Sequence, residues 1–149
     1  MGEPTKKIDH MVFNVRNLDE AVRFYTEVVG MRVVMRFNDR KMAFLSFGGD
    51  EWGPIRLFET GGTADADRQK NGFNHVAFHP EGGAPALEQL HQRLIEKGAK
   101  IDVVEHGSGR HQSVYFFDPD GNRLEFYTEN PEWTKECQAK VAAAFADEK

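Results

Sequence analysis

Two histidines occupy the same position in two similar segments of the chain. His10 lies in Ile-Asp-His-Met-Val-Phe (residues 8–13), and His75 lies in Phe-Asn-His-Val-Ala-Phe (residues 73–78). Both segments alternate apolar side chains as a half-buried strand does. Glu125 follows the Asp-Pro-Asp-Gly-Asn sequence of residues 118–122 and falls on a third predicted strand. If two paired repeats place equivalent residues about a pseudo-twofold axis, these three side chains face one interior.

Two imidazoles and one carboxylate are a ligand set for a divalent transition metal, and non-haem Fe(II) centres use it with positions left open. A metal held in this way acts as a Lewis acid, activates water or binds oxygen. A single histidine or glutamate on a strand is more often a structural or solvated residue. The shared position of His10 and His75, together with Glu125, favours a metal site.

Four further residues are candidates for contact with a substrate. His106 and His111 fall in a Gly/Ser/His-rich loop predicted over residues 105–111, and Tyr115 falls in the strand that follows. Each can exchange a proton with a substrate atom, which makes the three acid–base candidates. The histidines have a plain surface role as their alternative, and Tyr115 a place in the core. Arg56 is the candidate substrate-binding residue, with a neighbouring carboxylate as its alternative partner.

The elements that must position these residues occur twice in the same order, strand-helix-strand-strand-strand, and a final helix follows. Asn17 predicts the start of the first helix and Gly30 its end, while Pro85 and Gly98 do the same for the second. The predicted strands cover residues 8–15, 31–37, 41–47, 55–59, 72–78, 99–104, 113–117 and 123–128. An internal repeat of this kind predicts two related modules.

The length of 149 residues predicts a single domain. Its first module covers about residues 7–60, and a polar, Gly-containing linker follows over residues 61–71. The second module covers about residues 72–129, and the terminal helix residues 131–149.

The composition argues against several classes of partner. The net charge is −5 and no basic stripe is present, so no nucleic-acid partner is predicted. No apolar run approaches the ~18 residues of a membrane span, so no membrane partner is predicted either. The single cysteine, Cys137, cannot form an internal disulfide. Because the first residues also lack a secretory pattern, a cytoplasmic location is expected.

Several segments resemble the vicinal oxygen chelate superfamily, which includes glyoxalase I, fosfomycin-resistance proteins, methylmalonyl-CoA epimerase, bleomycin-resistance proteins and extradiol dioxygenases. They are residues 9–13, 24–25, 29–31, 74–78 and above all 113–125, with the Asp-Pro-Asp-Gly-Asn block and Glu125. The resemblance implies an α+β fold. Two βαβββ modules form a cupped, mixed and mostly antiparallel sheet, with a helix outside each. It also implies a small-molecule substrate and a homodimer.

Position 56 narrows the choice within the superfamily. Glyoxalase I and the epimerases carry a fourth metal ligand, a carboxylate, on the strand that matches residues 55–57, where this chain has Arg56. The resemblance therefore favours the three-ligand members, which are the extradiol dioxygenases and the fosfomycin-resistance enzymes. The spacing of residues 104–125 matches the extradiol signature. However, residues 50–54 lack the histidine that serves those enzymes as acid–base catalyst.

The first prediction is thus an extradiol-dioxygenase-like oxidoreductase that holds Fe(II) and acts on a catechol-type aromatic. One alternative is a glyoxalase-like lyase or isomerase, or a thiol transferase of the fosfomycin-resistance type, with Mn, Ni, Zn or Co. The other alternative is a metal-free module that binds a drug, as the bleomycin-resistance proteins do.

Overall fold

The computed structural model describes residues 8–48, 53–61, 73, 75–106 and 111–146. The chain divides into two compact units. Unit 1 consists of residues 1–73 together with 118–122, and unit 2 consists of residues 74–117 together with 123–149.

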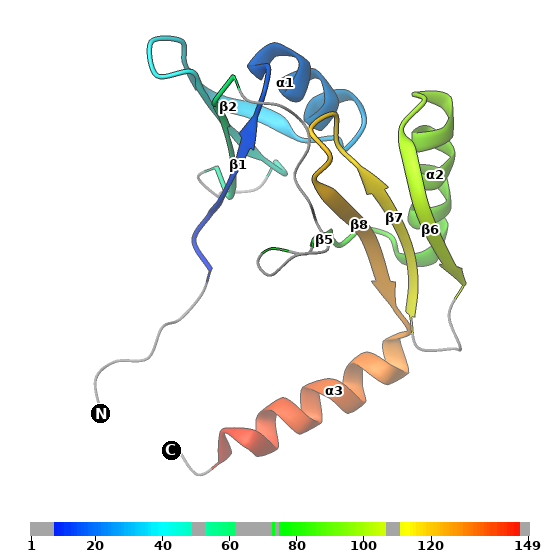
Figure 1. Ribbon diagram of the computed structural model, residues 1–149. Coiled ribbons are helices and arrows are strands. Elements are labelled where there is room, and N and C mark those ends of the chain that lie inside the picture. The colour runs from blue at the N-terminus through cyan, green and yellow to red at the C-terminus, as the bar shows by residue number, and fades with distance from the viewer. Residues whose placement is uncertain (1–7, 49–52, 62–72, 74, 107–110, 147–149) are drawn as a thin grey trace. The chain divides into compact units, whose positions relative to one another are not determined.

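Unit 1 is a four-stranded sheet with one helix (Figure 1). The strands have the order β1-β4-β3-β2, in which β1 and β4 are parallel and the other neighbours are antiparallel. The elements are β1 (Met11–Val15), α1 (Leu18–Glu27), β2 (Arg32–Phe37), β3 (Met42–Ser46) and β4 (Ile55–Glu59).

Helix α1 begins where the sequence predicts and ends at Glu27, shortly before the predicted stop at Gly30. The side chain of Asn17 accepts a hydrogen bond from the amide of Glu20, 2.9 Å away, which satisfies one of the free amides of the first turn. Gly30 has φ 91°, a conformation that glycine adopts without the strain that a side chain brings. The buried face of the helix, which includes Ala21 and Tyr25, packs against the sheet.

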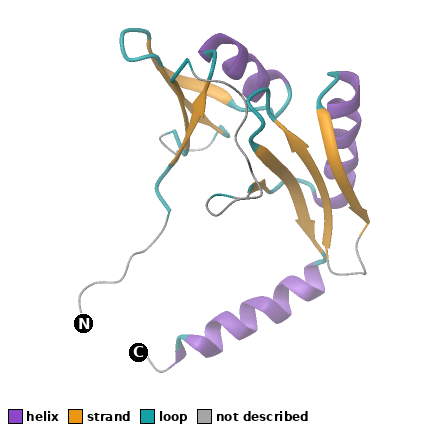
Figure 2. Cartoon of the chain, viewed as in Figure 1, coloured by secondary structure: helices purple, strands orange, loops and turns teal. Residues whose placement is uncertain are grey.

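Unit 2 repeats this architecture of strands and a helix (Figure 2). Its strands have the order β5-β8-β7-β6, and β5 and β8 are the parallel pair. Helix α2 covers one face of its sheet through the buried side chains of Leu87 and Leu94. The elements are β5 (Val76–Phe78), α2 (Gly83–Glu96), β6 (Lys100–His106), β7 (His111–Phe117), β8 (Arg123–Glu129) and α3 (Pro131–Ala144).

The turn between β7 and β8 belongs to unit 1. The buried carboxylate of Asp118 accepts hydrogen bonds from the Tyr25 hydroxyl at 2.8 Å and from the Asn122 side chain at 2.7 Å. Arg16 donates to Asp120 through its backbone amide and its Nε. The polar side chains of the Asp-Pro-Asp-Gly-Asn block therefore shape and anchor a turn.

The predicted repeat and the α+β class are confirmed, while several boundaries differ. In the residues that the structure describes, each module contributes one four-stranded mixed sheet. The predicted histidine loop was too long, because β6 continues to His106 and β7 already begins at His111. Helix α2 begins at Gly83, two residues before Pro85, because Gly82 takes φ 107° at the N-cap position. In the described part of the chain, no helix is long and apolar enough to cross a membrane.

Candidate functional site

The sheet of unit 2 has one apolar face and one face with polar side chains. Val114 and Phe116 on β7 and Leu124 and Phe126 on β8 are buried, in keeping with the face that α2 covers. Because side chains alternate along a strand, Ser113, Tyr115 and Glu125 lie on the opposite face. The register places Tyr115 directly across from Glu125, and Glu125 across from Ala77 on β5.

Glu125 is the centre of the polar cluster. Only 4% of its surface is exposed. The hydroxyl of Ser113 donates to its Oε1 at 2.6 Å, and His75 Nε2 lies 3.0 Å from its Oε2. A buried carboxylate is costly unless its oxygens have partners, and these two side chains supply them. His75 and Glu125, two of the three predicted metal ligands, thus lie together.

Tyr115 borders this pair. Its ring meets the His75 ring edge-on, with 5.4 Å between centroids, and the Arg123 guanidinium lies 4.0 Å from the centroid of the tyrosine ring. Burial raises the pKa of the Tyr115 hydroxyl above its usual value, and the carboxylate of Glu125 raises it further. The phenol therefore stays protonated near neutral pH and can donate a hydrogen bond.

The donor atoms of His75 and Glu125 fit a divalent transition metal in type, since imidazole nitrogen and carboxylate oxygen are common ligands for such ions. The hydrogen bond from Ser113 fixes the carboxylate, as groups around metal ligands commonly do. Within the residues that the structure describes, no three His, Cys, Asp or Glu side chains form a group that could hold a metal ion.

His10, the third predicted ligand, belongs to unit 1 and precedes β1. Its Nδ1 lies 2.7 Å from Asp9 Oδ2, and its side chain is 38% exposed. His10 stands two residues before Val12, which pairs with Arg56. His75 likewise stands two residues before Ala77, which pairs with Glu125. The two histidines are therefore equivalent in the two sheets.

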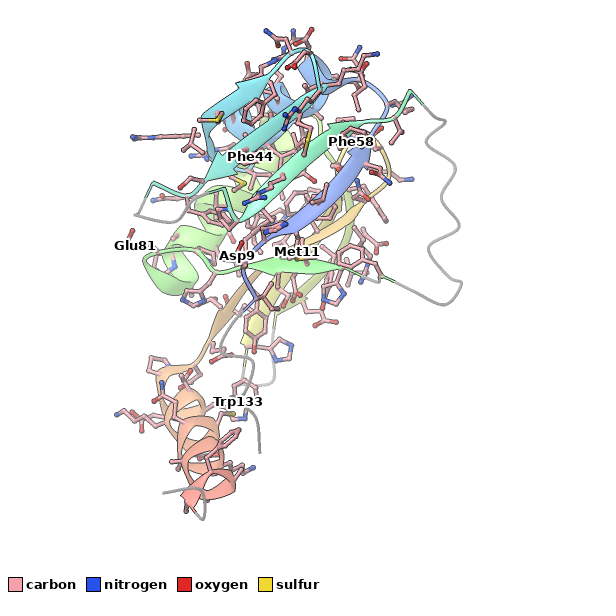
Figure 3. All side chains as sticks on the ribbon, turned by 90° about the vertical axis from the view of Figure 1, so that its left-hand side faces the viewer. Asp9, Met11, Phe44, Phe58, Glu81 and Trp133 are labelled. Carbon is pink, nitrogen blue, oxygen red and sulfur yellow. The ribbon has the colours of Figure 1, made fainter. Side chains whose placement is uncertain are left out.

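Arg56 accordingly occupies in unit 1 the position that Glu125 occupies in unit 2. Its Nε donates to the carbonyl oxygen of Gly53 at 3.1 Å, and its guanidinium lies 4.1 Å from the centroid of the Phe44 ring. Figure 3 labels Phe44 on β3 of this sheet. The register thus gives unit 1 a cation where unit 2 has a carboxylate.

The structure separates His111 from the pair of His75 and Glu125. His111 starts β7, four residues and about 13 Å along the strand from Tyr115. Its Nε2 lies 3.3 Å from Glu105 Oε2, and its ring stacks on Tyr127 with 5.6 Å between centroids. The side chain of His106 lies outside the described residues.

Sequence reasoning missed Ser113 and Arg123. Ser113 carries a usable signal, because it lies two residues before Tyr115 and so shares its face of the strand. Arg123 donates from Nε to Asp102 Oδ2 at 2.9 Å, a contact between residues far apart in the sequence that no local pattern indicates.

Three comparisons with known proteins bear on the identity of the chain. The family model of the glyoxalase/bleomycin resistance protein/dioxygenase superfamily matches residues 7–126. The metallothiol transferase FosB of Shouchella clausii is 35% identical over 81% of this chain and 79% of its own length. The glutathione transferase FosA of Serratia marcescens is 30% identical over 82% and 80%.

A catechol-2,3-dioxygenase of Bacillus subtilis is 28% identical over 85% of this chain but only 43% of its own length. Among solved structures, a glyoxylase/bleomycin resistance protein/dioxygenase domain from Frankia sp. EAN1pec matches with a TM-score of 0.70 and 25% identity, over 85% of this chain and 99% of that one. The chain belongs to the glyoxalase/bleomycin resistance protein/dioxygenase superfamily.

Proposed function

We propose that this protein is a metal-dependent enzyme that transfers a small thiol to an electrophilic substrate. His75 and Glu125 of unit 2 would hold a divalent metal, with His10 as the third ligand. That histidine would come from unit 1 of the same chain or of a second copy, since a homodimer is also predicted. A cytoplasmic location is likewise a prediction for this protein.

The observation that carries the metal site is the arrangement around Glu125. A carboxylate that is almost fully buried has an imidazole on one oxygen and a serine hydroxyl on the other. A purely structural carboxylate more often lies at the surface or pairs with lysine or arginine. Arg123, which lies on the same strand as Glu125, is engaged with Asp102 instead.

The relatives support transfer of a thiol over the alternatives. Two of them, at 35% and 30% identity, are named as a metallothiol transferase and a glutathione transferase, and this chain spans about four fifths of each. A bound metal would supply Lewis-acid activation of a substrate oxygen. When the thiol sulfur forms its bond to carbon and the carbon–oxygen bond breaks, the oxygen needs a proton.

Tyr115 is the proposed source of that proton, and the proton that the thiol loses would restore the phenol. Its raised pKa keeps the hydroxyl protonated near neutral pH, and its ring lies between contacts with the His75 ring and the Arg123 guanidinium. Ser113 orients the carboxylate of Glu125, and burial of that carboxylate keeps water away from it. The acid–base roles predicted for His106 and His111 remain predictions.

The extradiol dioxygenase remains the second candidate. The similarity to the catechol-2,3-dioxygenase and the two-histidine, one-carboxylate set favour it. In that case Fe(II) would be the native metal and a catechol-type aromatic the substrate. This chain covers less than half of the length of that relative, so dioxygenase activity is ranked below thiol transfer.

A direct comparison of activities tests the proposal. Purified protein is loaded anaerobically with Mn, Fe(II), Co, Ni or Zn and given glutathione or cysteine with a panel of epoxides that includes fosfomycin. Loss of free thiol is measured, and oxygen uptake is measured separately with a catechol panel. We expect metal-dependent loss of thiol that falls more than about 100-fold in Glu125→Gln, because a ligand is lost.

Two matched variants control for general damage to the fold. Glu88→Gln and His91→Ala alter a glutamate and a histidine on α2, and we expect activity close to wild type from both. Oxygen uptake without loss of thiol would instead support the dioxygenase. No metal-dependent activity in either assay, together with metal-free binding of a drug, would contradict both.

A further inference from the structure

Unit 2 contains a cavity of about 420 Å³ on the side of its sheet that α2 covers. It lies where the first turn of α2 meets the start of β7 and the end of β8. His75 and Glu125 lie on the other face of the sheet. We propose that this cavity is a separate binding site for a small oxyanion, either a carboxylate or a phosphate.

The first turn of α2 supplies unused backbone donors. Gly82 is the N-cap residue, so no side chain caps the helix, and the first turn has no acidic residue. The amides of Gly83 and Ala84 belong to the turn in which helical amides lack a partner within the helix. The helix dipole adds a partial positive charge at this end. Helix α1 differs, because Asn17 caps it and Asp19 and Glu20 lie in its first turn.

Thr128 is the second and independent observation. Its side chain lines the cavity, and only 4% of its surface is exposed. A methyl group on Gly83 would lie 3.9 Å from Thr128 Oγ1, so the hydroxyl is directed at the first turn of α2. Within the described part of the chain, this hydroxyl has no hydrogen-bond partner. A buried hydroxyl without a partner costs free energy, and a bound acceptor would remove that cost.

The other polar groups of the cavity suit an anion. Gln112 pairs with Thr128 across the two strands, lines the same cavity and can donate through its amide. Glu129 also borders the cavity. Because successive side chains of a strand point to opposite faces, its side chain lies on the opposite face from Thr128. Its carboxylate accepts a hydrogen bond from the Thr134 hydroxyl at 2.7 Å. Glu81, labelled in Figure 3, is exposed and does not line the cavity.

These groups define the ligand by its chemistry. Residues that carry two backbone amides, a hydroxyl and a carboxamide line one cavity at a helix N-terminus, and helix N-termini bind carboxylate and phosphate groups in proteins. A volume of about 420 Å³ falls within the range of small-molecule sites. The ligand is therefore a small molecule with one carboxylate or phosphoryl group, held apart from the candidate metal centre.

The test is a titration of the full-length protein with inorganic phosphate and, separately, with acetate. The amide resonances of Gly83 and Ala84 are followed by NMR, with sodium chloride at matched ionic strength as the reference. We expect saturable shifts of both amides with at least one of the two anions. Thr128→Val keeps the shape of the side chain but removes the hydroxyl, and should weaken binding by at least about tenfold.

Thr26→Val is the matched control, because the Thr26 hydroxyl bonds to the backbone of α1 in unit 1. We expect it to bind as wild type does. The tighter of the two anions identifies the carboxylate or the phosphate as the ligand group. Shifts equal to those in sodium chloride, or an unchanged affinity in Thr128→Val, would overturn the proposal. Because the readout involves no metal and no turnover, it is independent of the proposed enzymatic function.

Discussion

Positions 56 and 125 show how one residue distinguishes the two halves of the molecule. The two positions are equivalent by register, yet one carries arginine and the other glutamate. The two strands, residues 55–58 and 124–127, can also be aligned in the sequence by their apolar residues. The sequence could not predict that Ser113 donates to Glu125 at 2.6 Å, since that contact depends on the pairing of β7 with β8.

At residue scale, Ser113→Ala should weaken metal binding without removing it. The carboxylate of Glu125 would lose the hydrogen bond that orients it, and such losses lower metal affinity about 10–100-fold. Competition with a chelating dye measures the change. Ser46→Ala, which removes another buried serine hydroxyl but in unit 1, should leave the affinity unchanged. Equal metal affinities for Ser113→Ala and wild type would exclude this role for Ser113.

Asp118 should make stability depend on pH. Burial raises the pKa of its carboxyl in the folded protein, although the hydrogen bonds from Asn122 and Tyr25 oppose this. The folded protein therefore holds this proton more tightly than the unfolded chain. The contribution of Asp118 to the free energy of unfolding is largest at low pH and declines as the pH rises from the ordinary aspartate value to the raised one.

Denaturant unfolding of wild type and Asp118→Asn across this pH range tests the prediction. The difference between the two profiles should decline by at most about 1.4 kcal/mol per pH unit, the limit for one proton. Asp39→Asn, in the exposed turn between β2 and β3, is the control for loss of a carboxylate. Parallel profiles for wild type and Asp118→Asn would contradict the assignment.

At the scale of elements, local signals predicted the helix ends well and the strand ends less well. Asn17, Gly30 and Gly98 act where the sequence places them, because caps and positive φ angles are properties of single residues. Strand ends depend on what the neighbouring strand offers. β1 begins only at Met11, where pairing with β4 begins, although the apolar alternation already starts at Ile8.

Asn17→Ala should lower the free energy of unfolding by about 1 kcal/mol, because the first turn of α1 loses its cap. Chemical denaturation followed by circular dichroism measures the loss. Asn17→Asp keeps an accepting oxygen and should stay within a few tenths of a kcal/mol of wild type. If both variants were equally destabilised, the cap would not be the cause.

At the scale of the whole molecule, the repeat was readable because both halves keep the same order of elements and the same sheet order. The assignment of residues 118–122 to unit 1 was not readable, since in sequence they only join two strands of unit 2. Asp118, Asp120 and Asn122 look like an exposed turn in the sequence. Asp118 accepts from Tyr25 and Asn122, and Asp120 accepts from Arg16, which explains why all three are buried.

The predicted homodimer can be checked together with the origin of the third ligand. Light scattering should give about twice the chain mass of 16.9 kDa, and a monomeric mass would contradict the prediction.

Mixing His10→Ala with Glu125→Gln then shows which chain supplies His10. If His10 binds the metal of the other copy, the mixed dimer contains one intact site. If His10 binds the metal of its own chain, both sites lack a ligand. Recovery of metal binding therefore assigns His10 to the second copy.

The most direct test of the central claim is the metal affinity and stoichiometry of the dialysed protein. We predict one Mn²⁺ or Fe(II) per chain in wild type, Glu88→Gln and His91→Ala. We predict more than about 100-fold weaker binding in His75→Ala and Glu125→Gln, since each removes a ligand. Metal bound equally well by wild type and both ligand variants would show that the pair of His75 and Glu125 is structural.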